Sequence, residues 1–232
     1  MKNPNKFSRL NPIIRRFWPA QILVSIIAML LLVTTTPVMA HHVMDGKMPS
    51  NFFEGFMSGV GHPIIGFDHL TFIVSVGLFA AIKSQGIFIP ISFILSAMVG
   101  TGLHLAQLSM PGVELFVSGS ILLFGILLVL KEQPNTLIIT GLTAIAGLFH
   151  GYAYGESIFG AEMTPLLAYL LGFSFIQLMI ILGVFWLTKN LVSRQFTSGN
   201  NILQSSGFVI CGIGGTFVFS QIVNLLLPLP KG

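Results

Sequence analysis

Two histidines and an aspartate lie within eight residues of this sequence, at His62, Asp68 and His69. A continuous apolar run follows immediately, from Leu70 to Ile82. Ionisable side chains at the entrance of a membrane helix are energetically expensive, so they are functional candidates. Imidazole and carboxylate are also common transition-metal ligands. The stretch therefore fits a metal site, a proton site or a polar helix cap.

The spacing within this stretch favours a site over a cap. We expect Pro63 at the first helical position, where its missing N–H is not needed. His62, Gly66 and His69 would then share one face of a helix, and Gly66 would leave space beside the imidazoles. Asp68 would ligate an ion directly or orient an imidazole. In the plainer alternative, these polar groups only satisfy helix ends and neighbouring carbonyls.

A second group of ionisable residues lies near the end of another apolar run. His150 and Glu156 have the same histidine-to-acid spacing as His62 and Asp68. His104 lies in a third apolar run, where an interhelical hydrogen bond is the alternative to a metal-binding role. For His150 and Glu156 the alternative is a polar helix end.

The elements that carry these residues must be membrane helices. The chain is 53% hydrophobic and only 8% charged, whereas globular domains carry roughly 25% charged residues. Several apolar runs reach the ~20 residues that cross a bilayer. The fold class is therefore all-α, a polytopic membrane protein. The single cysteine, Cys211, excludes an intrachain disulfide and a paired-cysteine metal site.

Residues 1–40 have the pattern of a secretory signal peptide, expected to be cleaved after Ala40. An uncleaved first transmembrane helix is the alternative. Cleavage would place His41 and His42 beside a free α-amine, which is a metal chelate or simply a polar tail. Residues 41–62 are expected to form an external histidine-containing segment. Residues 63–232 are expected to form the transmembrane domain.

This domain is predicted to contain six helices, with a loop at 189–206. The expected spans are 63–82, 87–108, 113–130, 136–153, 165–188 and 207–227. The basic residues of the loops at 83–86, 131–135 and 189–206 place these loops in the cytoplasm. The mature N-terminus is then outside, in a bacterial-type inner (plasma) membrane.

The same topology separates the other ionisable residues. Six of the seven acidic residues and all six histidines fall on or near the outer side. This predicts one site that faces outward. Five of the eleven basic residues precede residue 41, and the remainder of the chain is about neutral, so no nucleic-acid partner is expected.

The segment from His62 to His69 resembles the His-Pro-x-x-Gly-x-Asp-His signature of the HupE/UreJ family. The resemblance extends over most of the chain, through Pro111-Gly112-Val113-Glu114 and the segment from Phe149 to Glu156. It implies a secondary permease for nickel, or for cobalt, associated with hydrogenase or urease maturation. By this resemblance His62, Asp68 and His69 would handle the metal in the first span, and His150 and Glu156 in the fourth.

We therefore expect a divalent-metal permease rather than an enzyme, with no prosthetic group. The metal is the substrate, and copper, iron and zinc also stay open because imidazole suits several ions. The bilayer is a partner, and a homo-oligomer is left open. The alternatives are an intramembrane zinc-dependent hydrolase and a non-transporting metal-binding assembly factor. The full set of expected metal residues is His41, His42, His62, Asp68, His69, His104, His150 and Glu156.

Overall fold

The structure is a computed structural model, and it describes residues 48–193 and 199–227. This described part contains seven α-helices and no strand. The helices are α2 (Phe52–Ile65), α3 (Phe67–Ile82), α4 (Phe88–Leu105), α5 (Val113–Val129), α6 (Thr136–Glu156), α7 (Met163–Ser193) and α8 (Gly199–Leu226). The predictions for the signal peptide and for His41 and His42 lie outside the described residues.

The predicted all-helical architecture is confirmed for the described residues, but six separate spans are not. Four helices, α4, α6, α7 and α8, are long and apolar enough to cross a membrane. Helices α2 and α3 add a fifth span only if the pair is counted together, because the two are bent by 80°. Helix α5 is apolar but has only 17 residues.

The first helix does not begin at Pro63, so that prediction is wrong. It begins at Phe52, and Pro63 lies inside it. The Asn51 side chain caps this start by accepting a hydrogen bond from the Glu54 amide at 3.0 Å. The Glu54 carboxylate in turn accepts from the Ser50 amide at 2.8 Å and from the Ser50 hydroxyl at 2.9 Å. Helix α2 therefore runs through the expected boundary between residues 62 and 63.

The chain breaks sharply at Gly66, between α2 and α3. Pro63 removes one backbone donor close to the end of α2, which weakens the last turn. Gly66 then takes an extended conformation, with φ −69° and ψ 93°. Its amide still donates to the His62 carbonyl at 2.9 Å. The axes of α2 and α3 therefore change direction sharply at Gly66.

The prediction of a loop at 189–206 is also wrong, because helices cover most of these residues. Helix α7 continues to Ser193, and α8 begins at Gly199. Lys189 and Leu191 are good helix formers, and neither glycine nor proline interrupts the end of α7. Polar composition marks where a helix leaves the apolar region, but it does not end the helix.

Three helix pairs pack closely, and glycines permit the approach. The pairs are α4 with α6, α5 with α8, and α2 with α7. A Cβ at Gly151 of α6 would overlap the Ala97 backbone of α4, and one at Gly59 of α2 would overlap the Tyr169 backbone of α7. Small residues let membrane helices approach in this way.

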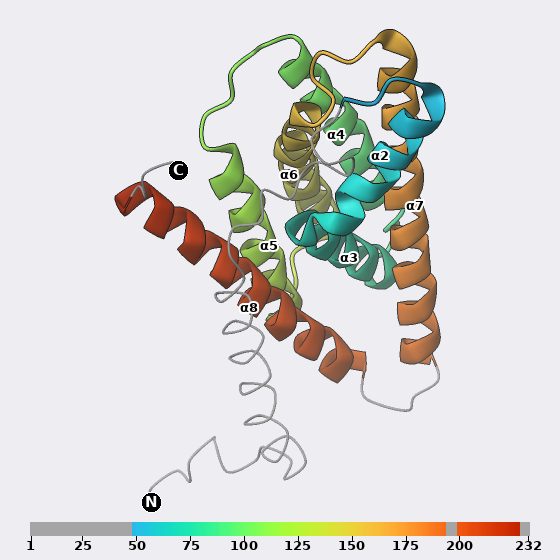
Figure 1. Cartoon of the computed structure of the whole chain (residues 1–232). Coiled ribbons are helices and arrows are strands. Elements are labelled where there is room, and N and C mark those ends of the chain that lie inside the picture. The colour runs from blue at the N-terminus through green and yellow to red at the C-terminus, as the bar shows by residue number, and fades with distance from the viewer. Residues whose placement is uncertain (1–47, 194–198, 228–232) are drawn as a thin grey trace, which may run out of the picture.

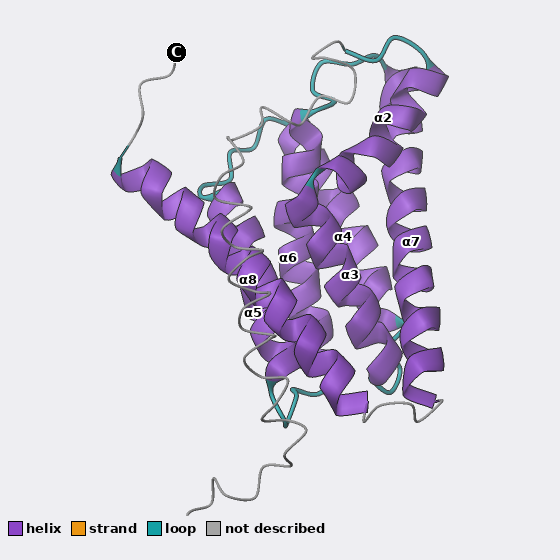
Figure 2. Ribbon diagram, turned by 60° about the horizontal axis from the view of Figure 1, so that its bottom comes forward, coloured by secondary structure: helices purple, strands orange, loops and turns teal. Residues whose placement is uncertain are grey.

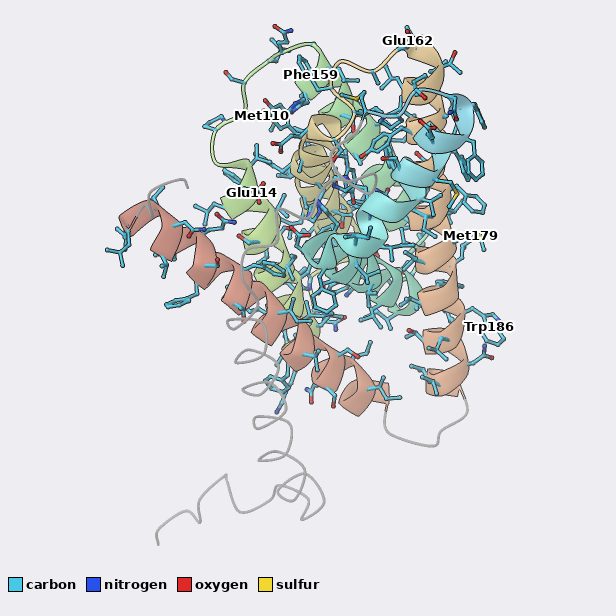
Figure 3. The ribbon with its side chains drawn as sticks, in the orientation of Figure 1. Met110, Glu114, Phe159, Glu162, Met179 and Trp186 are labelled. Atoms are coloured by element: carbon cyan, nitrogen blue, oxygen red, sulfur yellow. The ribbon has the colours of Figure 1, made fainter. Side chains whose placement is uncertain are left out.

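Helix α3 lies in the middle of these pairs (Figure 1) and packs against every other described helix. Phe72, Ile73, Val76 and Phe79 are completely buried along it. The outer faces of the surrounding helices carry large apolar side chains, such as Met179 and Trp186, which point away from the bundle (Figure 3). This pattern fits a bundle surrounded by lipid.

The ends of the bundle differ in charge. At one end, which we call the basic end, Lys83 donates to the Pro134 carbonyl at 2.6 Å and Thr136 donates to the Ser84 carbonyl at 2.8 Å. The adjoining ends of α7 and α8 point the same way (Figure 2). The opposite, acidic end carries the loops at 106–112 and 157–162, and Figure 3 shows Glu162 there. The loops at 83–86 and 131–135 therefore lie at the same end of the bundle, as the sequence predicted.

Candidate functional site

Three imidazoles from three helices form a buried row just behind the break at Gly66. His62 of α2, His69 of α3 and His150 of α6 are 3%, 2% and 0% exposed. The ring centroids of His62 and His69 lie 5.5 Å apart, and those of His69 and His150 lie 5.0 Å apart. His69 therefore occupies the middle of this imidazole row.

The break itself brings His62 and His69 together. Seven residues of straight α-helix advance by about 10 Å, which would hold the two rings apart. The 80° bend shortens that distance. The space expected beside Gly66 is filled by the neighbouring ring, since a Cβ there would lie 2.7 Å from His69 Cδ2 and 3.2 Å from Asp68 Oδ1. Glycine is needed here because of this close approach.

The contacts of Ser120 in α5 support one assignment of the ring protons. With its hydroxyl donating to the Val117 carbonyl at 2.7 Å, its oxygen accepts from His150 Nε2, 3.0 Å away. Neutral His150 then has a lone pair on Nδ1, which lies 2.8 Å from His69 Nδ1. His69 must donate across that contact. The lone pair of neutral His69 consequently lies on Nε2, and a ring nitrogen with a lone pair is the form that binds a metal ion.

Aromatic side chains enclose the imidazole row. The Tyr154 ring lies 4.5 Å from His69 and 5.1 Å from His62, and Phe72 stacks on His150 at 4.5 Å. The Tyr169 hydroxyl donates to the Tyr154 carbonyl at 2.9 Å. These contacts fix the rings and keep bulk water away from them.

Sequence reasoning missed these supporting residues, together with Ser157, whose hydroxyl lies 2.7 Å from His62 Nδ1. A signal was present for the tyrosines, because the whole chain contains only three. Tyr154 also follows His150 by four residues, which places both on one helix face.

Asp68 lies at the edge of the site and is half-buried. Its Oδ1 accepts a hydrogen bond from the His69 backbone amide at 2.8 Å. A negative charge in the first turn of α3 also interacts favourably with the partial positive charge of the helix N-terminus. Asp68 thus anchors the start of the helix that carries His69.

The other expected residues lie apart from the imidazole row. His104 of α4 packs against Tyr152 and Phe159, with ring centroids at 4.6 Å and 5.8 Å. Its Nδ1 has no hydrogen-bond partner among the described residues. Glu156 is exposed at the last residue of α6. Neither residue has a ring contact or hydrogen bond to the imidazole row in the described part of the chain.

The row does not enclose a ready-made metal cage. Within residues 48–193 and 199–227, no three His, Cys, Asp or Glu side chains are arranged to hold one metal ion together. Successive imidazoles can instead bind a cation with one or two nitrogens at a time. Weak binding at several sites suits movement through a protein, because the ion must also leave.

Comparison with known proteins gives two matches. The family described as HupE / UreJ protein matches residues 28–217. The protein described as Protein HupE, from Rhizobium leguminosarum bv. viciae, is 27% identical over 122 residues. That alignment covers 52% of this chain and 63% of the relative, which is less than two thirds of the relative's length. No solved structure matches the chain.

Proposed function

The chain belongs to the HupE/UreJ family, and from that premise we propose that it is a secondary permease for a divalent transition-metal ion. Nickel is the proposed substrate, and cobalt is the alternative. The observation that carries the proposal is the buried row of His62, His69 and His150, contributed by three different helices. Ionisable groups inside a membrane bundle mark ion pathways.

In this proposal the acidic end attracts the hydrated cation and Asp68, at the edge of the site, draws it toward the row. The imidazoles then replace part of its water shell. In the proton assignment above, His69 presents the lone pair of Nε2 to the ion, whereas both ring nitrogens of His150 make hydrogen bonds, so His150 must give one of them up to bind the metal. Since imidazole binds nickel, copper and zinc, affinity alone does not select the ion.

We further propose that the acidic end faces outward from a bacterial-type inner membrane. Lys83 and Lys131 lie at the basic end, and cytoplasmic loops carry an excess of lysine and arginine. The ion would then enter on the side where the negative charges gather. The mature N-terminus would be on that side as well.

Uptake of radioactive nickel by proteoliposomes containing the purified chain tests this function. We expect Asp68→Asn and His69→Ala to abolish uptake without reducing insertion. Glu132→Gln is the control, because this exposed carboxylate lies at the basic end, away from the proposed entrance, and it should transport normally. Full uptake by both site variants would refute the assignment.

Uptake should also fall as the pH is lowered from about 7.5 to about 5.5, because protons compete with the metal for imidazole nitrogens. An unchanged rate over that range would contradict histidine ligation. The reconstituted system also separates the remaining hypotheses: a non-transporting assembly factor or a hydrolase would bind metal without loading the vesicles.

A further inference from the structure

A buried glutamine on α7 has no partner that accounts for its presence. Gln177 is completely buried, and neither its Nε2 nor its Oε1 makes a hydrogen bond within the described part of the chain. Two hydroxyls are also buried without a hydrogen-bond partner among the described residues. They belong to Tyr154 on α6 and to Ser174, which lies one turn before Gln177 on α7. Unpaired buried polar atoms are costly, and they commonly mark a place for water or an ion.

The contacts of α7 place Gln177 opposite the break between α2 and α3. Toward the acidic end, α7 meets α2 where Phe173 approaches Gly59. Toward the basic end, it meets α3 where Ile181 approaches Gly77. Gln177 lies midway between these two contacts. It is therefore deeper than Tyr169, the α7 residue whose ring lies 6.4 Å from His62.

Tyr154 connects this position with the imidazole row. Its ring packs on His69 and His62, and it also contacts Phe173, one turn before Gln177 on α7, with ring centroids 5.3 Å apart. The Tyr154 hydroxyl and the Gln177 amide are both buried without a hydrogen-bond partner in the described part of the chain. Two neutral polar groups thus flank one buried position beside the site.

We propose that Gln177 Oε1 and the Tyr154 hydroxyl, with the Ser174 hydroxyl beside them, form a second station for the transported divalent cation. The inference rests on the proposed permease function. Neutral oxygen donors bind a transition metal less tightly than imidazole, so they can accept an ion and its remaining waters and release it again.

Gln177→Leu tests the proposal, because it removes both amide atoms at similar volume. A cation station predicts that the maximal nickel uptake rate falls about tenfold, as for loss of groups that support a metal site. Nickel binding to the imidazole row, measured by calorimetry on the purified full chain, should be unchanged. Thermal stability should be unchanged or higher, because unpaired polar atoms are replaced by an apolar group. Tyr154→Phe should lower uptake in the same way.

Thr140→Val is the matched control, since the Thr140 hydroxyl is also buried and unpaired but lies near the opposite end of α6. It should transport normally. Wild-type uptake by Gln177→Leu would overturn the proposal, as would a decrease that merely follows lost thermal stability. Failure of the permease function itself would differ from both results, because the unmodified chain would then show no uptake.

Discussion

The contacts of one serine hydroxyl favour one arrangement of protons on two histidines. With Ser120 donating to the Val117 carbonyl, His150 donates through Nε2 and accepts through Nδ1. The contact to His69 then has a single direction. Partners of this kind tune metal ligands without touching the metal.

Ser120→Ala should therefore weaken nickel binding, by about tenfold, because His150 is no longer held in one tautomer. Ser118→Ala is the control on the same helix: Ser118 is also buried, but its hydroxyl bonds only to carbonyls of α5. Calorimetric titration of the purified variants with nickel checks both. Equal affinities for the two variants would contradict the tautomer assignment.

The sequence identified the histidines of the row but not its neighbours. Six residues of helix rotate by about 600°, so Glu156 lies about 120° around α6 from His150. From His62 to Asp68 the same spacing crosses the break at Gly66, so it does not follow one straight helix. Ser120 and Ser157 could not be predicted, because their roles depend on which helices face one another.

At the level of helices, the crossing of α4 and α6 positions His150. Gly151, the next residue, packs against the backbone of Ala97. Gly141 is on the same helix, but a Cβ there would meet nothing within 4 Å. The two glycines therefore lie on the same helix, α6, but only Gly151 is packed against a neighbouring helix.

Gly151→Ala should lower the free energy of unfolding by about 1–3 kcal/mol, because a methyl group forces the helices apart. It should also reduce nickel uptake, since His150 moves with α6. Gly141→Ala should instead raise the free energy of unfolding by about 0.5–1 kcal/mol, the usual effect of replacing glycine inside a helix. Thermal melting in detergent distinguishes the two, and equal melting temperatures would contradict the crossing.

Apolar runs predicted the helices that became α4, α5 and α6 to within a few residues. They failed at α2, where polar residues near Phe52 hide the helix start. In the sequence, Pro63 and Gly66 are compatible with two structures: the start of a helix at Pro63, or the end of a helix just before Gly66. Only the packing of α2 along α7 favours the second.

At the scale of the whole molecule, charge distinguishes the two ends of the bundle. Glu54, Glu114, Glu156 and Glu162 all lie at helix ends or loops of the acidic end. Lys83 and Lys131 lie at the other end, beside a cavity of about 290 Å³ that both residues line. An outward acidic end would concentrate cations at the entrance.

Cysteine labelling in intact cells tests this orientation. The background is Cys211→Ser, which removes the single native cysteine. A membrane-impermeant thiol reagent should label Ser109→Cys, at an exposed position of the acidic end. It should label Glu132→Cys, exposed at the basic end, only after the membrane is permeabilised. The reverse pattern would show that the acidic end faces the cytoplasm.

X-ray absorption at the nickel edge shows whether the buried imidazoles bind the transported ion. The sample is the purified, nickel-loaded chain carrying His41→Ser and His42→Ser, which removes histidines outside the described residues. We expect scattering from imidazole rings around nickel, and this scattering should decrease when His69→Ala is added. A spectrum without imidazole scattering, or one unchanged by His69→Ala, would contradict it.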